Sequence, residues 1–107
     1  MRQNHRAPLL SLLGLARRAG KLSLGNDAAV ESLRKGQARL VLLASDLSPR
    51  SRRGIEAAAQ QAEAPCRETG ASMDEIARAI GKHTGILAVN DEGFSKKIEQ
   101  LCSEPTQ

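Results

Sequence analysis

Apolar residues along the chain follow two spacings that alternate with each other. Segments whose apolar residues recur every three or four positions predict five helices, between Pro8 and Gly20, Gly25 and Gly36, Ser48 and Pro65, Ser72 and Gly81, and Asn90 and Leu101. Short apolar runs between them predict strands, at Lys21–Leu24, Leu40–Ala44, Cys66–Thr69 and Ile86–Val89. Strands that alternate with helices predict an α/β fold, a three-layer α/β/α sandwich around a mixed sheet of about four strands.

Two of the predicted strands, Leu40–Ala44 and Ile86–Val89, are apolar at every position. A strand without polar positions is typical of the centre of a sheet that is covered on both faces. Helices are therefore expected on each side of the sheet. The apolar residues predicted to face it are Ala29, Val30 and Leu33 in the second helix, and Ile55, Ala58, Ala59 and Ala62 in the third.

Residues that favour helix ends stand at several of these boundaries. Ser48 before Pro49 predicts an N-cap followed by proline at the first helical position. Ser72 with Glu75 three residues later predicts a capping box. Gly81 is expected to close the fourth helix in the left-handed conformation that glycine adopts most easily.

At 107 residues the chain is expected to form one domain, covering residues 8–102. Residues 1–7 show no apolar periodicity and are expected to be a disordered basic arm or the remnant of a linker, with residues 103–107 as a disordered tail. The sequence has no run of 18 apolar residues and no signal-peptide pattern. We therefore expect no membrane partner and a cytoplasmic location.

The sequence offers little for catalysis. The two histidines, His5 and His83, are far apart, and Cys66 and Cys102 lack the close spacing of a zinc or redox motif. The two cysteines are interpreted as reduced, partly buried small hydrophobic residues. Most serines lie at helix starts, where capping explains them. We expect no metal, no cofactor and no enzymatic activity.

Aromatic residues are almost absent, because Phe94 is the single aromatic residue of the chain. Modules that read single-stranded bases stack them on Phe, Tyr or Trp. If nucleic acid binds, recognition through backbone and shape is expected instead.

Charge is distributed unevenly between the two halves. Eleven of the sixteen Lys and Arg residues and three of the twelve acidic residues lie in the first 53 positions, so this half carries +8 and the remainder −4. A one-sided positive field is typical of a protein that binds phosphates. The alternative is a solvated, charge-rich surface that keeps the chain soluble.

Three polar segments are candidates for phosphate contact. Gly25-Asn26-Asp27 enters a helix downstream of Arg17, Arg18 and Lys21, and backbone N–H groups at a helix start bind anions. Lys82-His83-Thr84-Gly85 precedes the last strand, and Ser48–Arg53 places Arg50 in a first helical turn. The alternatives are a plain cap for the first segment and a solvated connector for the second.

Several of these segments together resemble one known family. The segments are Leu12–Leu22, the helix from Gly25 to Gly36, the strand Leu40–Asp46 with Ser48-Pro49, and Ala79–Lys82. They are similar to the kink-turn RNA-binding ribosomal protein superfamily, which includes large-subunit proteins seven-Ae and thirty-e, and specifically to its bacterial YlxQ-type branch. The match spans about Leu9 to Leu101, nearly the whole chain.

The resemblance implies a three-layer sandwich that grips structured RNA at one end of its sheet. It implies ribosomal RNA and the ribosome as partners, and a small basic partner domain that such domains can be fused to or encoded beside. Carried onto this chain, the gripping elements are residues 25–27, 46–50 and 82–85. The RNA-binding residues expected from charge and resemblance together are Arg17, Arg18, Lys21, Gly25, Asn26, Asp27, Arg50, Lys82, His83 and Thr84.

The chain departs from the family pattern at the second helix. Members that bind kink-turns carry Gly-x-Asn-Glu-x-x-Lys. In the register that starts at Gly25, this chain has Asp27 at the Asn position, Ala28 at the Glu position and Glu31 at the Lys position. A register shifted by one residue restores an Asn-Asp pair but places Val30 at the lysine position.

Two other functions stay open. One is a protein-interaction module that kept the fold and lost kink-turn recognition, which Ala28 and Glu31 favour. The other is a domain of a larger RNA-processing protein.

Overall fold

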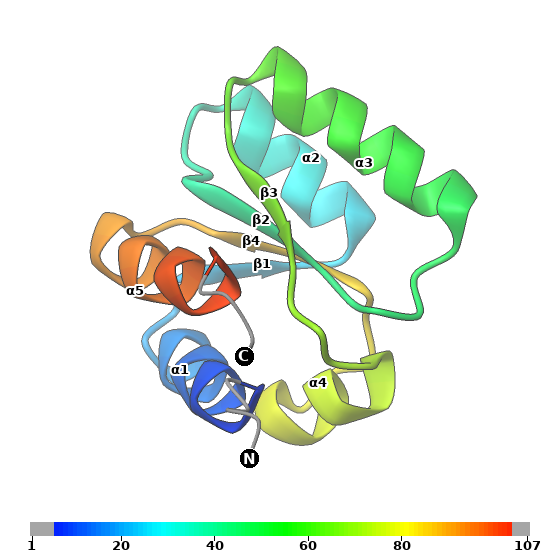
Figure 1. Cartoon of the computed structure of the whole chain (residues 1–107). Coiled ribbons are helices and arrows are strands. Elements are labelled where there is room, and N and C mark those ends of the chain that lie inside the picture. The colour runs from blue at the N-terminus through cyan, green and yellow to red at the C-terminus, as the bar shows by residue number, and fades with distance from the viewer. Residues whose placement is uncertain (1–5, 104–107) are drawn as a thin grey trace.

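The chain was analysed as a computed structural model that describes residues 6–103. These residues form helices and strands in alternation: α1 (Arg6–Arg18), β1 (Leu22–Leu24), α2 (Asn26–Arg34), β2 (Leu40–Leu43), α3 (Pro49–Gln61), β3 (Cys66–Glu68), α4 (Met73–Ile80), β4 (Ile86–Val89) and α5 (Glu92–Ser103). Figure 1 shows the sheet as the middle layer, with α2 and α3 on one face and α1, α4 and α5 on the other. The predicted three-layer sandwich is confirmed.

The strands lie in the order β1-β4-β2-β3, with β4 antiparallel to both neighbours and β2 parallel to β3. Three strands, β1, β2 and β3, therefore point the same way. Their carboxyl ends meet the amino end of β4 at one end of the sheet, which we call the loop end. It consists of residues 25–27, 45–50, 69–72 and 83–85.

The two central strands are buried at every position, as predicted, because each alternates its side chains between two cores. Leu40 and Leu42 of β2 pack in the core beneath α1, α4 and α5. Val41 and Leu43 pack in the core beneath α2 and α3. A strand that serves two cores has no position for a polar side chain.

Helix α1 begins at Arg6, two residues before Pro8. Arg6 and Ala7 therefore belong to the helix and not to the predicted arm. Arg6 has a tertiary reason to be ordered, since its guanidinium lies 3.4 Å from the carbonyl oxygen of Gly70 and 3.5 Å from the carboxylate of Glu75. Residues 1–5 of the arm and 104–107 of the tail lie outside the described residues.

The predicted inner faces of α2 and α3 need small corrections. Ala62 follows the last residue of α3 and is exposed, so it does not extend the buried stripe. In α2 the polar Ser32 is buried, whereas Val30 is half-buried. Ser32 is tolerated there because its hydroxyl donates to Asn90 Oδ1 at 2.6 Å, and the Asn90 amide donates to Ser23 at 2.9 Å.

The capping box predicted at α4 is confirmed. The Ser72 hydroxyl accepts from the Glu75 amide at 3.2 Å, and the Glu75 carboxylate accepts from the Ser72 amide at 2.9 Å. Gly81 ends the helix in the left-handed conformation, at φ 79°.

Replacement of Ser72 by alanine is expected to lower the free energy of unfolding by about 1 kcal/mol, because a side-chain cap is lost. Urea unfolding followed by circular dichroism measures this loss. A Ser72→Asp variant, which restores an acceptor, should recover most of it. Equal stability of all three proteins would contradict the assigned role of the cap.

Candidate functional site

Three helices begin at the loop end, because α2, α3 and α4 follow the carboxyl ends of β1, β2 and β3. A helix amino end carries free N–H groups and the positive end of the helix dipole. Several such ends at one place make it favourable for anions. The loop end therefore has the electrostatic character expected for phosphate contact before any side chain is considered.

Of the three helix starts, that of α2 has the fewest hydrogen-bond partners for its first backbone N–H groups. Gly25 precedes the helix with φ 94° and ψ 166°, and no side chain caps the helix there, whereas Ser48 and Ser72 cap α3 and α4. The exposed residues Asn26 and Asp27 form the first turn. The first amides of α2 are thus available to an external acceptor.

The loop before β4 is joined to this helix start. The carbonyl oxygen of Ile86 accepts from the Gly25 amide at 2.9 Å and from the Thr84 hydroxyl at 3.2 Å. Thr84 is buried, and its hydroxyl also accepts from the Ile86 amide at 3.3 Å. The structure therefore uses the Thr84 side chain to fix this loop beside Gly25.

Gly85 allows the same loop to pack against its neighbours. A Cβ atom at Gly85 would lie 2.9 Å from a methyl carbon of Leu47 and 3.2 Å from the sulfur of Met73. The amide of Ala44 donates to the Gly85 carbonyl at 2.9 Å. Loops from four separate parts of the sequence are thereby packed into one surface.

Helix α3 supplies free cations to this surface. Arg50 and Arg53 are exposed, and neither makes an ion pair with another described residue. Arg52, between them, pairs instead with Glu56 and Glu68. Arg50 and Arg53 are therefore available to bind an external anion, whereas Arg52 is held by two glutamates of the protein.

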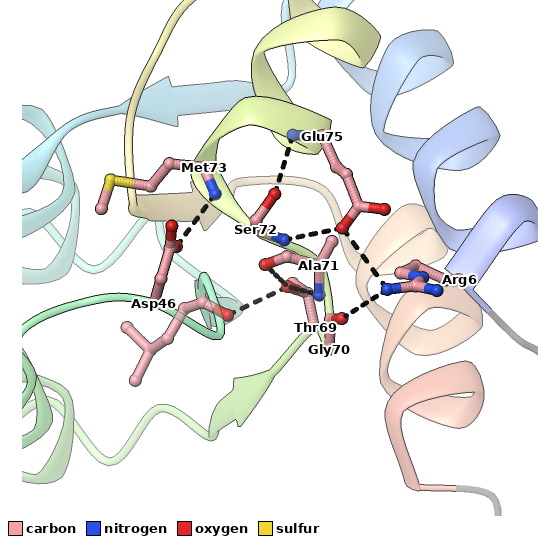
Figure 2. A network of polar contacts seen from close by, with 9 residues as sticks. Arg6, Asp46, Thr69, Gly70, Ala71, Ser72, Met73 and Glu75 are labelled. Carbon is pink, nitrogen blue, oxygen red and sulfur yellow. Dashed lines mark hydrogen bonds and ion pairs between the residues drawn. The ribbon is translucent and has the colours of Figure 1, made fainter.

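Two carboxylates at or beside the loop end, Asp46 and Asp74, contact other groups of the protein, whereas Asp27 is exposed and makes no ion pair with another described residue. Figure 2 shows Asp46 pointing at the start of α4, where its carboxylate accepts from the Met73 amide at 3.0 Å. Asp74 lies 3.1 Å from His83 Nε2. The negative charge of Asp46 and Asp74 is directed to groups of the protein, which reduces the repulsion that a phosphate would meet.

Not all predicted site residues come together. Lys21 lies beyond the amino end of β1, where its carbonyl accepts from the Asn90 amide at 2.8 Å, so β1 separates it from Gly25. Arg17 donates to the carbonyl oxygen of Ile80 at 3.3 Å, and Ile80 is two positions before Lys82. Arg18 lines the outer surface that α1 and α4 share. The loop end unites Gly25, Asn26, Asp27, Arg50, His83 and Thr84, and Lys82 leads into it from the end of α4.

Sequence reasoning missed the contribution of the β3–α4 loop. The buried Thr69 hydroxyl donates to the carbonyl of Leu43 at 3.0 Å and accepts from the Ala71 amide at 3.0 Å. Figure 2 shows this loop between Asp46 and Arg6. The run of small and polar residues before the capping box indicates a loop at this place. The hydrogen bond that joins this loop to β2 cannot be predicted from the sequence.

Within residues 6–103, no group of three His, Cys, Asp or Glu side chains is arranged to hold a metal ion. The helices of this range are all too short or too polar to cross a bilayer.

The two cysteines are free and half-buried, as predicted. Burial raises the pKa of the Cys66 thiol from 9.0 to about 11, and the nearby carboxylate of Glu56 adds to this effect. Burial likewise raises the pKa of Cys102 to about 11. Both thiols are protonated, and therefore unreactive, near neutral pH.

We expect both cysteines to react with a thiol reagent at pH 8 about tenfold more slowly in the native protein than in urea. The raised pKa lowers the thiolate fraction about 100-fold, and the greater nucleophilicity of a more basic thiolate offsets part of this. Absorbance of released thionitrobenzoate gives the rates. Fast labelling of the native protein would contradict the burial of the thiols.

Fold and site together define a class of protein, a small α/β/α domain that presents helix amino ends and unpaired arginines at one end of its sheet. The chain belongs to the ribosomal protein L7Ae/L30e/S12e/Gadd45 family, whose model matches residues 7–99. This confirms the resemblance derived from the sequence. The family description names ribosomal proteins and no enzymatic activity.

Individual relatives agree with this assignment. The chain is 34% identical over 101 residues to RNA-binding protein YlxQ of Enterococcus faecium, which covers 94% of this chain and 97% of the relative. YlxQ of Bacillus subtilis is 34% identical over 91 residues, covering 84% and 90% of the two chains. Large ribosomal subunit protein eL30 of Dictyostelium discoideum is 30% identical over 93 residues, covering 85% and 83%.

Solved structures show the same fold. A protein with unknown function from Bacillus halodurans superposes with a TM-score of 0.86 at 36% identity, covering 92% of this chain and 99% of the other. The 15.5kD RNA binding protein of Giardia lamblia superposes with a TM-score of 0.76 at 16% identity, covering 94% and 87%. The second similarity shows the fold alone.

Proposed function

We propose that this protein binds structured RNA through the loop end of its sheet, as a ribosome-associated protein without enzymatic activity. The observation that carries the proposal is the uncapped start of α2 at Gly25, packed beside the loop before β4. The relatives named RNA-binding protein YlxQ and ribosomal protein eL30 support it.

Each part of the loop end has a role in this proposal. The first amides of α2, at Asn26 and Asp27, donate to phosphate or base acceptors, because no side chain of the protein occupies them. Arg50 and Lys82 neutralise flanking phosphates, and the exposed His83 follows Lys82 in the loop before β4. Thr84 acts indirectly by holding its loop against Gly25.

The proposed surface is narrower than the one predicted from the sequence. It leaves out Arg17, which the carbonyl of Ile80 engages, and Lys21, which lies across β1 from Gly25. Arg18 is left out because it lies on the outer surface of α1 and α4. Some basic residues that are close to the loop end in the sequence therefore lie away from it in the structure.

Amide chemical-shift mapping tests this proposal. Addition of an RNA hairpin with a sharp internal bend should shift the amides of residues 25–28, 50–53 and 82–85. The amides of α5, on the other face of the sheet, should stay unchanged. Shifts confined to α1 or α5, or no shift at all, would overturn it.

Recognition of a bent, kink-turn-like RNA is the finer part of the proposal, and Glu31 offers a gain-of-function test. Glu31 is exposed on α2 and pairs with Arg34 at 2.7 Å and Lys35 at 3.5 Å. We expect Glu31→Lys to raise affinity for bent RNA about tenfold at low salt, because a carboxylate facing phosphate is exchanged for a cation.

The control for this prediction is Glu92→Lys on α5. Glu92 also pairs with a lysine of its own helix, Lys96 at 3.5 Å, so the change in charge and in local pairing is similar. Affinity measured by fluorescence anisotropy should not change for this control by more than about twofold. Equal gains from both variants would mean that net charge alone attracts the RNA.

The alternative function is a protein-interaction module, which Ala28 and the acidic Glu31 favour because both depart from the family motif. Partner capture that survives nuclease treatment, together with absent RNA binding, would support it. A small basic partner domain, which the resemblance implies, remains a proposal that co-purification tests. The cytoplasmic location expected from the sequence also remains a proposal, and cell fractionation tests it.

A further inference from the structure

The outer surface of α1 and α4, away from the sheet, carries an open groove of about 610 Å³. Its apolar part comes from Leu10, Leu15, Gly14 and Ala79. Leu15 is 48% exposed, and among residues 6–103 it is the one large hydrophobic side chain that is exposed. The groove shares no residue with the loop end.

The floor of the groove is formed by close packing of α1 against α4. A Cβ atom at Gly14 would lie 3.2 Å from the carbonyl oxygen of Ala79, so the two helices cross at close range there. Arginines of α1 hold α4 at both ends, through Arg6 with Glu75 at 3.5 Å and through Arg17 with the Ile80 carbonyl at 3.3 Å. A preformed groove binds a partner without the cost of ordering its own walls.

The charges that line the groove are unequal in their availability. Glu75 is partly occupied, because its Oε1 atom accepts from the Ser72 amide and from Arg6. Arg18 and Arg78 are exposed and make no ion pair with any described residue. The groove therefore combines an apolar floor with two unpaired guanidinium groups, Arg18 of α1 and Arg78 of α4.

We propose that this groove docks an acidic, amphipathic segment of a partner protein. An apolar side chain of the segment covers Leu15 and Leu10, and its carboxylates pair with Arg18 and Arg78. RNA fits less well, because phosphates gain nothing from an apolar floor and no aromatic side chain lines the groove to stack a base. The small size of the groove predicts a weak, transient complex.

A titration of the whole 107-residue chain with two synthetic helical peptides tests the proposal. One peptide carries leucines one helical turn apart and flanked by glutamates, and the matched peptide carries lysines in place of the glutamates. The acidic peptide should shift the amides of residues 10–18 and 74–79. It should bind at least about tenfold more tightly than the lysine peptide, as expected from two charge-assisted pairs.

Two variants connect the effect to the groove. Arg18→Glu with Arg78→Glu should weaken the acidic peptide at least about tenfold, and Leu15→Glu should do the same. The matched control, Arg50→Glu with Arg53→Glu, changes the same charge at the loop end and should leave peptide binding unchanged. All of these side chains are exposed, so the amide spectra should otherwise stay the same.

Several outcomes would overturn the proposal. They are equal binding of the two peptides, shifts that fall outside the groove, no shift at the groove at all, or an effect of the loop-end control as large as that of the groove variants. Addition of bent RNA should leave the groove amides unchanged. Shifts there with RNA would make the groove part of an RNA surface instead, and would leave the loop-end proposal to be judged by its own amides.

Discussion

A variant with Arg50→Glu and Arg53→Glu is expected to bind bent RNA on the order of 100-fold more weakly than the unmodified protein at low salt. The two arginines lie in the first two turns of α3, are exposed and have no ion-pair partner among the described residues. Reversal replaces two attractions to phosphate by two repulsions. The dependence of log affinity on log salt should also become shallower, by about one for each cation lost.

This loss cannot be attributed to unfolding. Glutamate in the first turns of α3 interacts better with the helix dipole than arginine does, so the variant should be at least as stable as the parent. The control is Lys96→Glu with Lys97→Glu on α5, an equal change in charge on the other face of the sheet. Fluorescence anisotropy should show little effect for this control. Equal losses would mean that the loop end is not the site.

Gly25→Ala is expected to lower the free energy of unfolding by about 1–3 kcal/mol, because a φ of 94° with a ψ of 166° is open almost only to glycine. No neighbouring atom would contact the new methyl group, so the cost is backbone strain. Relief of the strain would displace the Gly25 amide from the Ile86 carbonyl. The start of α2 and the adjoining loop should then lose their shared geometry, and RNA affinity should fall.

Gly54→Ala is the matched control. Gly54 lies inside α3, is exposed, has no positive φ and has no neighbour within 4 Å of a Cβ atom. The same substitution should raise the free energy of unfolding there by about 0.5–1 kcal/mol, because alanine favours a helix interior more than glycine does. Chemical denaturation of both variants measures the difference. Two changes of the same sign would refute the strain assigned to Gly25.

The three layers of this fold could be predicted from the sequence because the pattern of apolar residues within each helix and strand shows which of its faces are buried. The apolar runs at β2 and β4 require cover on both faces, and Ser72 with Glu75 forms its capping box within one helical turn. Such features need no knowledge of distant residues. The elements and their order were therefore predicted correctly.

The grouping of the cations was less predictable. Lys21 is four positions before Gly25, but an extended strand of that length spans about 13 Å and places the two at opposite ends of the sheet. Arg17 is engaged by a carbonyl 63 positions later in the chain. Which arginines are available depends on such tertiary contacts, and no spacing in the sequence reveals them.

Binding of a bent RNA hairpin, compared with a straight duplex of the same composition across a series of salt concentrations, tests the central claim most directly. We predict that the bent RNA binds at least about tenfold more tightly, consistent with recognition by shape. Its log affinity should fall linearly with log salt, with a slope of about −0.7 to −0.9 per phosphate contacted. Equal affinity for both RNAs, or an affinity that does not respond to salt, would contradict the account.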